Sequence, residues 1–223
     1  MEHLILDIET IPAQSQFVKD FIAKTIKPPG AIKLEATIKK WHENDKESAI
    51  EDAINKTGLD GAFGQVVCVG YDLIEKGNSG VISGLDEAVV LNEFNNVLNT
   101  ISKNNWSSIC SVGHNISNFD LRFLLQRYMV NQIKPHPIIF RASYAKPWEA
   151  TIIYDTMIQF AGTGGRISLD KLCVALGLEG KGDIDGSMVA KMVADGRLDE
   201  VAQYCASDVS KTRSVFERMT FRK

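Results

Sequence analysis

The sequence predicts an α/β domain in which helices cover a mixed β-sheet. Short apolar runs that are too short for helices recur along the chain, and segments with apolar residues at helical spacing separate them. The second and third of these runs are joined by a glycine-containing turn, which predicts an antiparallel hairpin beside strand and helix repeats. The 223 residues are 44% hydrophobic and 24% charged, which suits one globular domain.

The first three strands come from the N-terminal third of the chain. Residues 3–8 form an apolar run that we interpret as a buried strand with Asp7 near its end. A second strand is predicted at residues 65–72. Residues 77–80 form a turn into a third strand at residues 81–83, so the second and third strands should form a hairpin.

Helices and strands alternate through the rest of the chain. Asp86 can cap a helix that carries apolar residues at helical spacing as far as Ile101. The elements expected after it are a strand at residues 108–112, a helix at 119–129, a strand at 151–154, and a helix at 169–176 that Gly177 ends. The remainder of the chain is predicted to be helical.

A charged segment interrupts this pattern after the first strand. Residues 13–61 are rich in lysine and glutamate, and residues 36–55 carry charges on most faces with few apolar anchors, among them Trp41. We interpret the segment as a helical insertion in one domain that spans residues 1–223. No internal repeat, low-complexity tract or linker divides the chain.

Composition indicates where the protein resides and what its cysteines do. No run approaches the ~20 consecutive apolar residues of a membrane helix, and the N-terminus lacks the basic start of a signal peptide, so we expect no membrane partner and a cytoplasmic location. The four cysteines lie far apart in apolar runs, without the two-residue spacing of a zinc site, and should be buried free thiols. The net charge of −3 lacks the basic excess of proteins that coat nucleic acid.

Two acidic residues stand near the end of the first strand. Asp7 and Glu9 are two positions apart, so on an extended strand both side chains point to one face. Charges beside an apolar run are costly to bury without a partner, and a hard divalent cation bound through oxygen is a natural one. Acids in this position are also common as helix caps, so the pair alone leaves that structural role open.

Two further motifs carry acids. Asp120 follows a buried strand and lies in the first turn of the next helix, where interaction with the helix dipole is the structural alternative. Tyr204 and Asp208 are four residues apart in a helical stretch, which places both on one face a turn apart. Tyr204 also suits a half-buried amphipathic position.

These motifs together resemble the DEDD (DnaQ-like) exonuclease superfamily, which carries Asp-x-Glu on its first strand, Asn-x-x-x-Phe-Asp midway and a final acid. Tyr204, four residues before Asp208, resembles the tyrosine subclass (DEDDy) of polymerase proofreading domains and ribonuclease D. The histidine subclass has histidine five residues before that acid, where this chain has Gln203. Residues 113–121, 168–172 and 182–186 look closest to stand-alone predicted exonucleases related to the family B DNA polymerase proofreading domain. The resemblance spans residues 3–213.

The resemblance implies a ribonuclease H-like fold and a 3′→5′ exonuclease that uses two divalent cations, Mg²⁺ or Mn²⁺. It assigns the metal ions to four acids and the orientation of the attacking water to a tyrosine. Asp7 would bridge the ions, Glu9 and Asp208 would complete the site of the attacking water, and Asp120 would hold the ion near the leaving oxygen. The implied catalytic residues are therefore Asp7, Glu9, Asp120, Tyr204 and Asp208.

The resemblance also implies the substrate class. Single-stranded DNA is favoured, and the alternatives are an RNA 3′-end exonuclease of the ribonuclease D type or a non-catalytic module that binds nucleic acid. A polymerase or repair protein would be a separate partner. The candidate substrate contacts are the backbone of Thr10, the side chain of Asn115, Phe119 either in the core or stacked on a base, and three basic residues, Arg141, Lys146 and Arg166.

Two more polar residues lie beside these motifs. His114 has the residue type of a general base, but at the end of a strand we expect its side chain to be hydrogen-bonded or to face solvent. Asp155 ends a predicted strand and is kept as a secondary candidate near the site. Residues 162–166 are rich in glycine and lack the Lys-Ser/Thr of a phosphate-binding P-loop, so we interpret them as a turn near the substrate.

Overall fold

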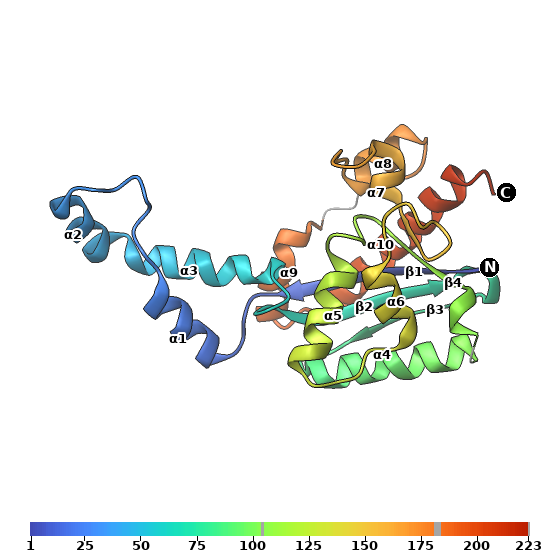
Figure 1. The fold of residues 1–223 in the computed structure, drawn as a ribbon, viewed down its shortest axis with the longest axis horizontal. Helices are drawn as coiled ribbons and strands as arrows, with labels where there is room; N and C mark the ends of the chain where they lie inside the picture. Colours follow the sequence, from blue (N-terminus) through green and yellow to red (C-terminus); the bar gives the residue numbers. More distant parts are fainter. Residues whose placement is uncertain (104, 181–183, 223) are drawn as a thin grey trace.

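A five-stranded mixed sheet forms the centre of the fold, as the sequence predicts (Figure 1). The computed structural model describes residues 1–103, 105–180 and 184–222. The strands have the order β3-β2-β1-β4-β5, with β2 antiparallel to both β1 and β3, and β4 parallel to both β1 and β5. Their bounds are β1 Glu2–Ile11, β2 Gln65–Leu73, β3 Asn78–Ser83, β4 Ile109–Gly113 and β5 Ile153–Asp155.

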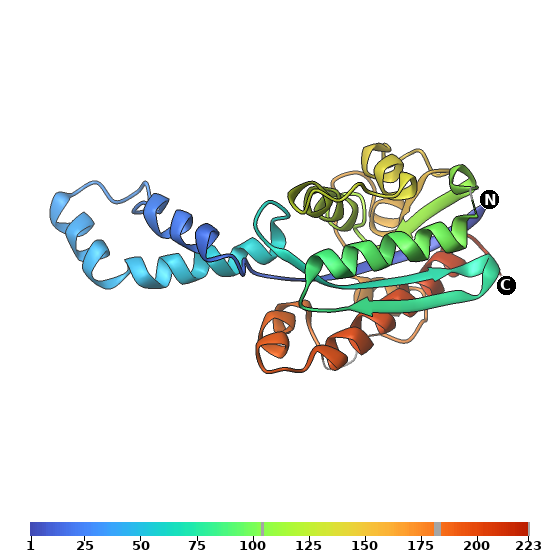
Figure 2. The ribbon, with the colours of Figure 1, turned by 90° about the horizontal axis from the view of Figure 1, so that it is seen from below.

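Helices cover both faces of the sheet. Their bounds are α1 Gln16–Thr25, α2 Glu35–Asn44, α3 Lys46–Lys56, α4 Glu87–Ser102, α5 Asp120–Val130, α6 Pro137–Tyr144, α7 Thr156–Ala161, α8 Leu169–Ala175, α9 Val189–Ala194 and α10 Leu198–Met219. Figure 2 shows α4 and α10 on opposite sides of the strands. None of the helices in the described part of the chain is long and apolar enough to span a membrane.

The central strand β1 divides the core because successive side chains of a strand point to opposite faces. Leu4, Leu6 and Ile8 belong to the larger apolar cluster, which includes residues of α4, α5 and α6. Ile5 and Ile11 pack on the other face with residues of α9 and α10. All four cysteines are buried and free, which confirms their predicted state.

The charged insertion is helical, as predicted, and comprises α1, α2 and α3. It extends away from the sheet in both views (Figures 1 and 2). The charged residues 36–55 lie in two helices, α2 and α3, which meet at Asp45. Trp41 of α2 is buried, with only 4% of its surface exposed.

One local prediction needs correction, two helices were not predicted, and one motif lies partly outside the described residues. The turn of the hairpin is at Ile74–Lys76 and Gly77, so Asn78, Ser79 and Gly80 already belong to β3. The region around Arg141 is the helix α6, with Pro137 at its first turn and the side chain of His136 accepting from the Ile138 amide. The short helix α7, capped by Asp155, was not predicted. The motif at residues 182–186 has its first two residues outside the described part of the chain.

Candidate active site

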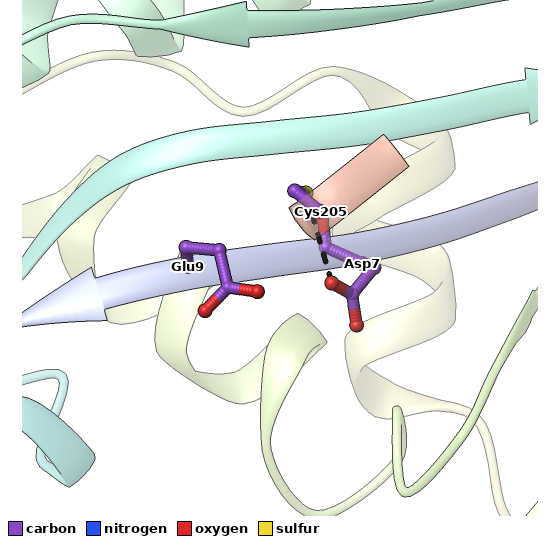
Figure 3. Close-up of side chains that lie close together, drawn as sticks. All are labelled: Asp7, Glu9 and Cys205. Carbon is purple, nitrogen blue, oxygen red and sulfur yellow. Dashed lines mark hydrogen bonds between the residues drawn. The ribbon is translucent and has the colours of Figure 1, made fainter. Parts of the chain in front are cut away.

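Asp7 and Glu9 lie on β1, and the Cys205 side chain of α10 lies beside Asp7 (Figure 3). The two acids share one face of the strand because their spacing is even, and neighbouring Ile8 points into the opposite core. Glu9 is buried and Asp7 half-buried. One oxygen of each carboxylate and the sulfur of Cys205 lie within 4.8 Å of one another. The first strand and the last helix therefore meet at this point.

Asp120 reaches the same strand from the start of α5. The parallel register between β1 and β4 ends at Ile5 and Val112, beyond which β1 runs on past the end of its neighbour. The Ile8 amide donates a hydrogen bond of 3.1 Å to Oδ1 of Asp120. Because Ile8 lies between Asp7 and Glu9, this bond brings a third carboxylate to the segment that carries the first two.

Helix α10 supplies the remaining residues. It packs closely on the sheet at Gly70, which pairs with Asp7 across the β1–β2 ladder. A Cβ atom on Gly70 would lie 2.8 Å from Sγ of Cys205 and 2.7 Å from Cγ2 of Val209. Glycine at this position therefore permits the close approach of the helix that carries Tyr204 and Asp208.

Asp208 is paired with a cation from its own helix. Nζ of Lys211 lies 2.9 Å from Oδ1 of Asp208, and both side chains are largely shielded from solvent. The spacing of three residues places the two groups on one face of α10. Lys211 thus compensates part of the negative charge that the carboxylates concentrate here.

The electrostatics of the site reflect crowded carboxylates. Burial, followed by the charges of Asp120, Glu9 and Asp208, raises the pKa of Asp7 well above its usual value. Burial, together with the charges of Asp208, Cys68 and Asp120, raises the pKa of Glu9 to about 9. Burial raises the pKa of Asp120 to about 7, although its hydrogen bond from the Ile8 amide acts in the opposite direction. The four acids therefore interact electrostatically in the folded chain.

Tyr204 is a poor base in this environment. Burial and the charges of Asp208 and Glu9 raise the pKa of its phenol above the ordinary value of 10. The phenol consequently keeps its proton at neutral pH. A protonated hydroxyl can donate a hydrogen bond and orient a neighbouring group.

The raised pKa values predict how stability depends on pH without metal. The ordinary pKa values of Asp120 and Glu9 are 3.8 and 4.5. Between those values and the folded-state pKa values of about 7 for Asp120 and about 9 for Glu9, the folded chain binds protons that the unfolded chain releases. The contribution of these two acids to the free energy of unfolding is complete below their ordinary pKa values. It is lost as pH rises through about 7 and about 9. In a chelator, Tm should fall across this window. A Glu9→Gln variant should show a smaller fall, and an equal fall in both proteins would contradict the assigned shift.

The donor atoms suit a divalent cation. Carboxylate oxygens are hard ligands of the kind that Mg²⁺ and Mn²⁺ prefer, and cations would relieve the repulsion that raises the pKa values of these acids. Cys205 adds a sulfur beside Asp7, at 3.6 Å from its Oδ2. A hydrogen bond with Cys68, together with burial, raises the pKa of the Cys205 thiol, so the sulfur remains protonated and acts as a neutral neighbour.

His114 and Asp155 have structural partners. His114 is hydrogen-bonded through Nδ1 to the Thr156 hydroxyl and through Nε2 to the Ile167 carbonyl, both at 2.9 Å. Asp155 is fully buried and accepts from the backbone amides of Asn115, Ser117, Met157 and Ile158. It therefore anchors the loop after β4 to the start of α7, with its carboxylate oxygens occupied by amides.

Three of the predicted substrate contacts lie beside the acids. Thr10 follows Glu9 at a register shift of β1, and its hydroxyl donates to the Gly58 carbonyl at 2.6 Å. Asn115 adopts a left-handed backbone conformation with φ +63 in the loop that leads to Asp120. Phe119 is half-buried with its ring 5.5 Å from that of Phe123, and it also lines a cavity next to Glu9. It therefore combines core packing with an accessible surface.

The three predicted basic contacts are distributed more widely. Arg141 donates to the Ser107 and Ile109 carbonyls near the start of β4, whereas the acids lie beyond the other end of the β1–β4 ladder. Lys146 is exposed after α6, with its ammonium 5.5 Å from the ring centre of Trp148. Arg166 is exposed next to Ile167, whose carbonyl contacts His114. Of these three basic residues, only Arg166 adjoins a residue that contacts the loop preceding Asp120.

Sequence reasoning missed the roles of Gly70, Cys205 and Lys211. The signal for Cys205 was present, because Val201, Cys205 and Val209 recur at intervals of four and mark the face of α10 that packs on the sheet. Gly70 lies inside an apolar strand, where glycine commonly marks a close approach of another segment. Neither pattern identifies which segment approaches.

Comparisons with known proteins identify a family and a shared fold. A family model described as "predicted 3′-5′ exonuclease related to the exonuclease domain of PolB" matches residues 81–223. Among solved structures, the family B DNA polymerase from the hyperthermophilic archaeon Pyrobaculum calidifontis matches 99% of this chain with a TM-score of 0.58 and 13% sequence identity. The match covers 24% of the polymerase, and at this identity it shows a shared fold. No curated protein gives a significant match.

Proposed function

The chain belongs to the family of predicted 3′-5′ exonucleases related to the exonuclease domain of PolB, and from this premise we propose that it hydrolyses phosphodiester bonds at the 3′ end of single-stranded DNA. The reaction would use two divalent cations, Mg²⁺ or Mn²⁺. Residues 1–223 would act as one nuclease domain that carries the insertion α1 to α3, and a polymerase or repair protein is the proposed partner.

One observation carries this proposal. Asp120, Glu9 and Asp208 lie close enough to Asp7 for their charges to raise its pKa, although they come from a strand and two helices far apart in sequence. Folding would not concentrate four carboxylates without a use for them, because mutual repulsion and burial both oppose it. Binding of hard cations accounts for the cluster, and the order of the acids along the chain is that of the superfamily which the sequence motifs resemble.

Each residue has a defined role in the proposed reaction. Asp7, Glu9, Asp120 and Asp208 would hold the cations, which when bound supply positive charge to the scissile phosphate and lower the pKa of water. Lys211 holds the Asp208 side chain at 2.9 Å and limits its motion. Tyr204, whose phenol keeps its proton, would hydrogen-bond to the attacking water and orient it. The Thr10 backbone and the Asn115 side chain would contact the terminal nucleotide.

End-labelled oligonucleotides test the proposal directly. We expect single-stranded DNA labelled at its 5′ end to be shortened one nucleotide at a time with Mg²⁺ or Mn²⁺, and to remain intact in a chelator. Duplex DNA and RNA of the same sequence are the matched substrates. If only RNA is shortened, the chain is a 3′-end exonuclease of RNA. If nucleic acid is bound but not cleaved with any of the metals, the chain is a non-catalytic binding module.

A further inference from the structure

We propose that the helical insertion forms one wall of the pocket for the 3′-terminal part of the substrate, and that Lys56 on this wall and Lys191 on the opposite wall contact its phosphates. This inference rests on the proposed function and adds to it the element that recognises the strand. The insertion lies outside residues 81–223, which the family model matches, so membership in the family assigns it no role.

The pocket lies directly beside the acids. It is a cavity of about 830 Å³, and its lining includes Glu9 and Thr10 of β1 and Phe119 at the start of α5. The insertion contributes Lys56 and Leu59, from the end of α3 and the short helix Thr57–Leu59 that follows it. Lys191 of α9 also lines the cavity. Its volume falls within the range of small-molecule sites and suits nucleotide-sized groups.

The insertion wall is fixed to the strand that carries the acids. The Thr10 hydroxyl donates to the Gly58 carbonyl at 2.6 Å, and the Ala13 amide donates to the Thr57 hydroxyl at 2.7 Å. Thr57 and Gly58 are buried. Because Thr10 is the neighbour of Glu9, Lys56 and Leu59 are held in a defined position relative to the carboxylates, although α1 and α2 extend far from the sheet (Figure 1).

The two lysines provide positive charge in a chain whose net charge is −3. Lys56 is exposed at the end of α3. Lys191 is exposed and pairs with Asp195 at 2.9 Å, and an exposed pair of this kind contributes little energy, so a phosphate can replace the carboxylate. Positive charge beside the acids is what a single-strand groove needs in order to hold the backbone.

Apolar side chains complete the pocket. Leu59 is 76% exposed and follows the buried Gly58. It lines the same cavity as Phe119. An aromatic ring and an aliphatic side chain in one cavity can contact the flat faces of a base without reading its edge. The pocket therefore favours an unpaired end with little sequence preference.

Salt dependence measures the phosphate contacts. The probe is a fluorescent single-stranded DNA with a free 3′ hydroxyl, and binding is measured by anisotropy at several salt concentrations with Ca²⁺ in place of Mg²⁺ to slow cleavage. For wild type, log K falls linearly with log salt, and each phosphate contact on a single strand contributes a slope of roughly 0.7. Lys56→Ala and Lys191→Ala should each reduce the slope by about that amount.

The matched control is Lys40→Ala, which removes the same charge from an exposed position on α2 and leaves the pocket unchanged. Its slope and its KM for cleavage should equal those of wild type, whereas Lys56→Ala and Lys191→Ala should raise KM several-fold with kcat preserved. The inference is overturned if the wild type shortens DNA and both pocket variants keep its slope and KM. If the wild type shortens no nucleic acid, the proposed function itself fails.

Discussion

Asp7→Asn is expected to lower the rate of DNA shortening by roughly 10³-fold, which corresponds to about 4 kcal/mol of lost transition-state stabilisation. Asp7 lies at the centre of the cluster, since the charges of Asp120, Glu9 and Asp208 all act on it. An amide retains the shape of the carboxylate and removes its charge, so cations would be held more weakly. Initial rates at saturating Mg²⁺ and Mn²⁺ measure the effect.

The same substitution should stabilise the fold in the absence of metal. Burial and three neighbouring carboxylates oppose ionisation of Asp7, so at neutral pH folding must either bury this charge or bind a proton, and a neutral amide removes that cost. We expect Tm in a chelator to rise above that of wild type, and the increase in Tm on adding Mn²⁺ to become smaller. A loss of activity accompanied by a lower Tm would indicate a damaged fold and would not support a metal-binding role.

Asp86→Asn is the control for this experiment. Asp86 is a carboxylate that caps α4 by accepting from the Ala88 and Val89 amides, and asparagine caps helices equally well. This variant removes one negative charge from a position outside the cluster. Its cleavage rate and its response to metal should match those of wild type. A large effect here would mean that general charge, and not the cluster, determines activity.

Gly70→Ala is expected to reduce both stability and cleavage. The new Cβ would lie 2.7 Å from Val209 and 2.8 Å from Cys205, distances at which one segment has to move. Overpacking of this kind costs about 1–3 kcal/mol. Because α10 carries Tyr204 and Asp208, a shift of the helix away from the sheet would also displace two of the proposed catalytic groups, and small displacements in an active site reduce rates strongly.

Thermal unfolding and cleavage rates at a temperature well below Tm separate these two effects. The control is Gly30→Ala, because a Cβ on Gly30 would meet nothing within 4 Å. Adding Val209→Ala to Gly70→Ala removes one of the two close contacts and should restore part of both properties. Full activity in Gly70→Ala would show that the position of α10 tolerates displacement, contrary to the expected result.

Much of the fold could be read from local patterns. The apolar runs identified β1, β2 and β4 to within a few residues, and the cap at Asp86 identified the start of α4. The helix α6 was missed because its region carries charged and aromatic residues that read as a loop, and its start depends on Pro137 and the His136 side chain. A cap of this kind involves only a few residues, and the charged and aromatic residues around it make the helix hard to recognise.

The sequence by itself determined which residues carry the proposed chemistry. Their types, their spacing within short motifs and the order of those motifs can all be read without a structure, and they identify Asp7, Glu9, Asp120, Tyr204 and Asp208. Only the tertiary structure decided what surrounds them. Gly70 lets α10 approach the sheet, Asp155 serves as a cap, and the insertion joins the pocket through Thr10 and Gly58. These outcomes depend on contacts between segments far apart in the chain. A periodic pattern of apolar residues predicts that a side chain is buried, but it does not identify the segment that packs against it.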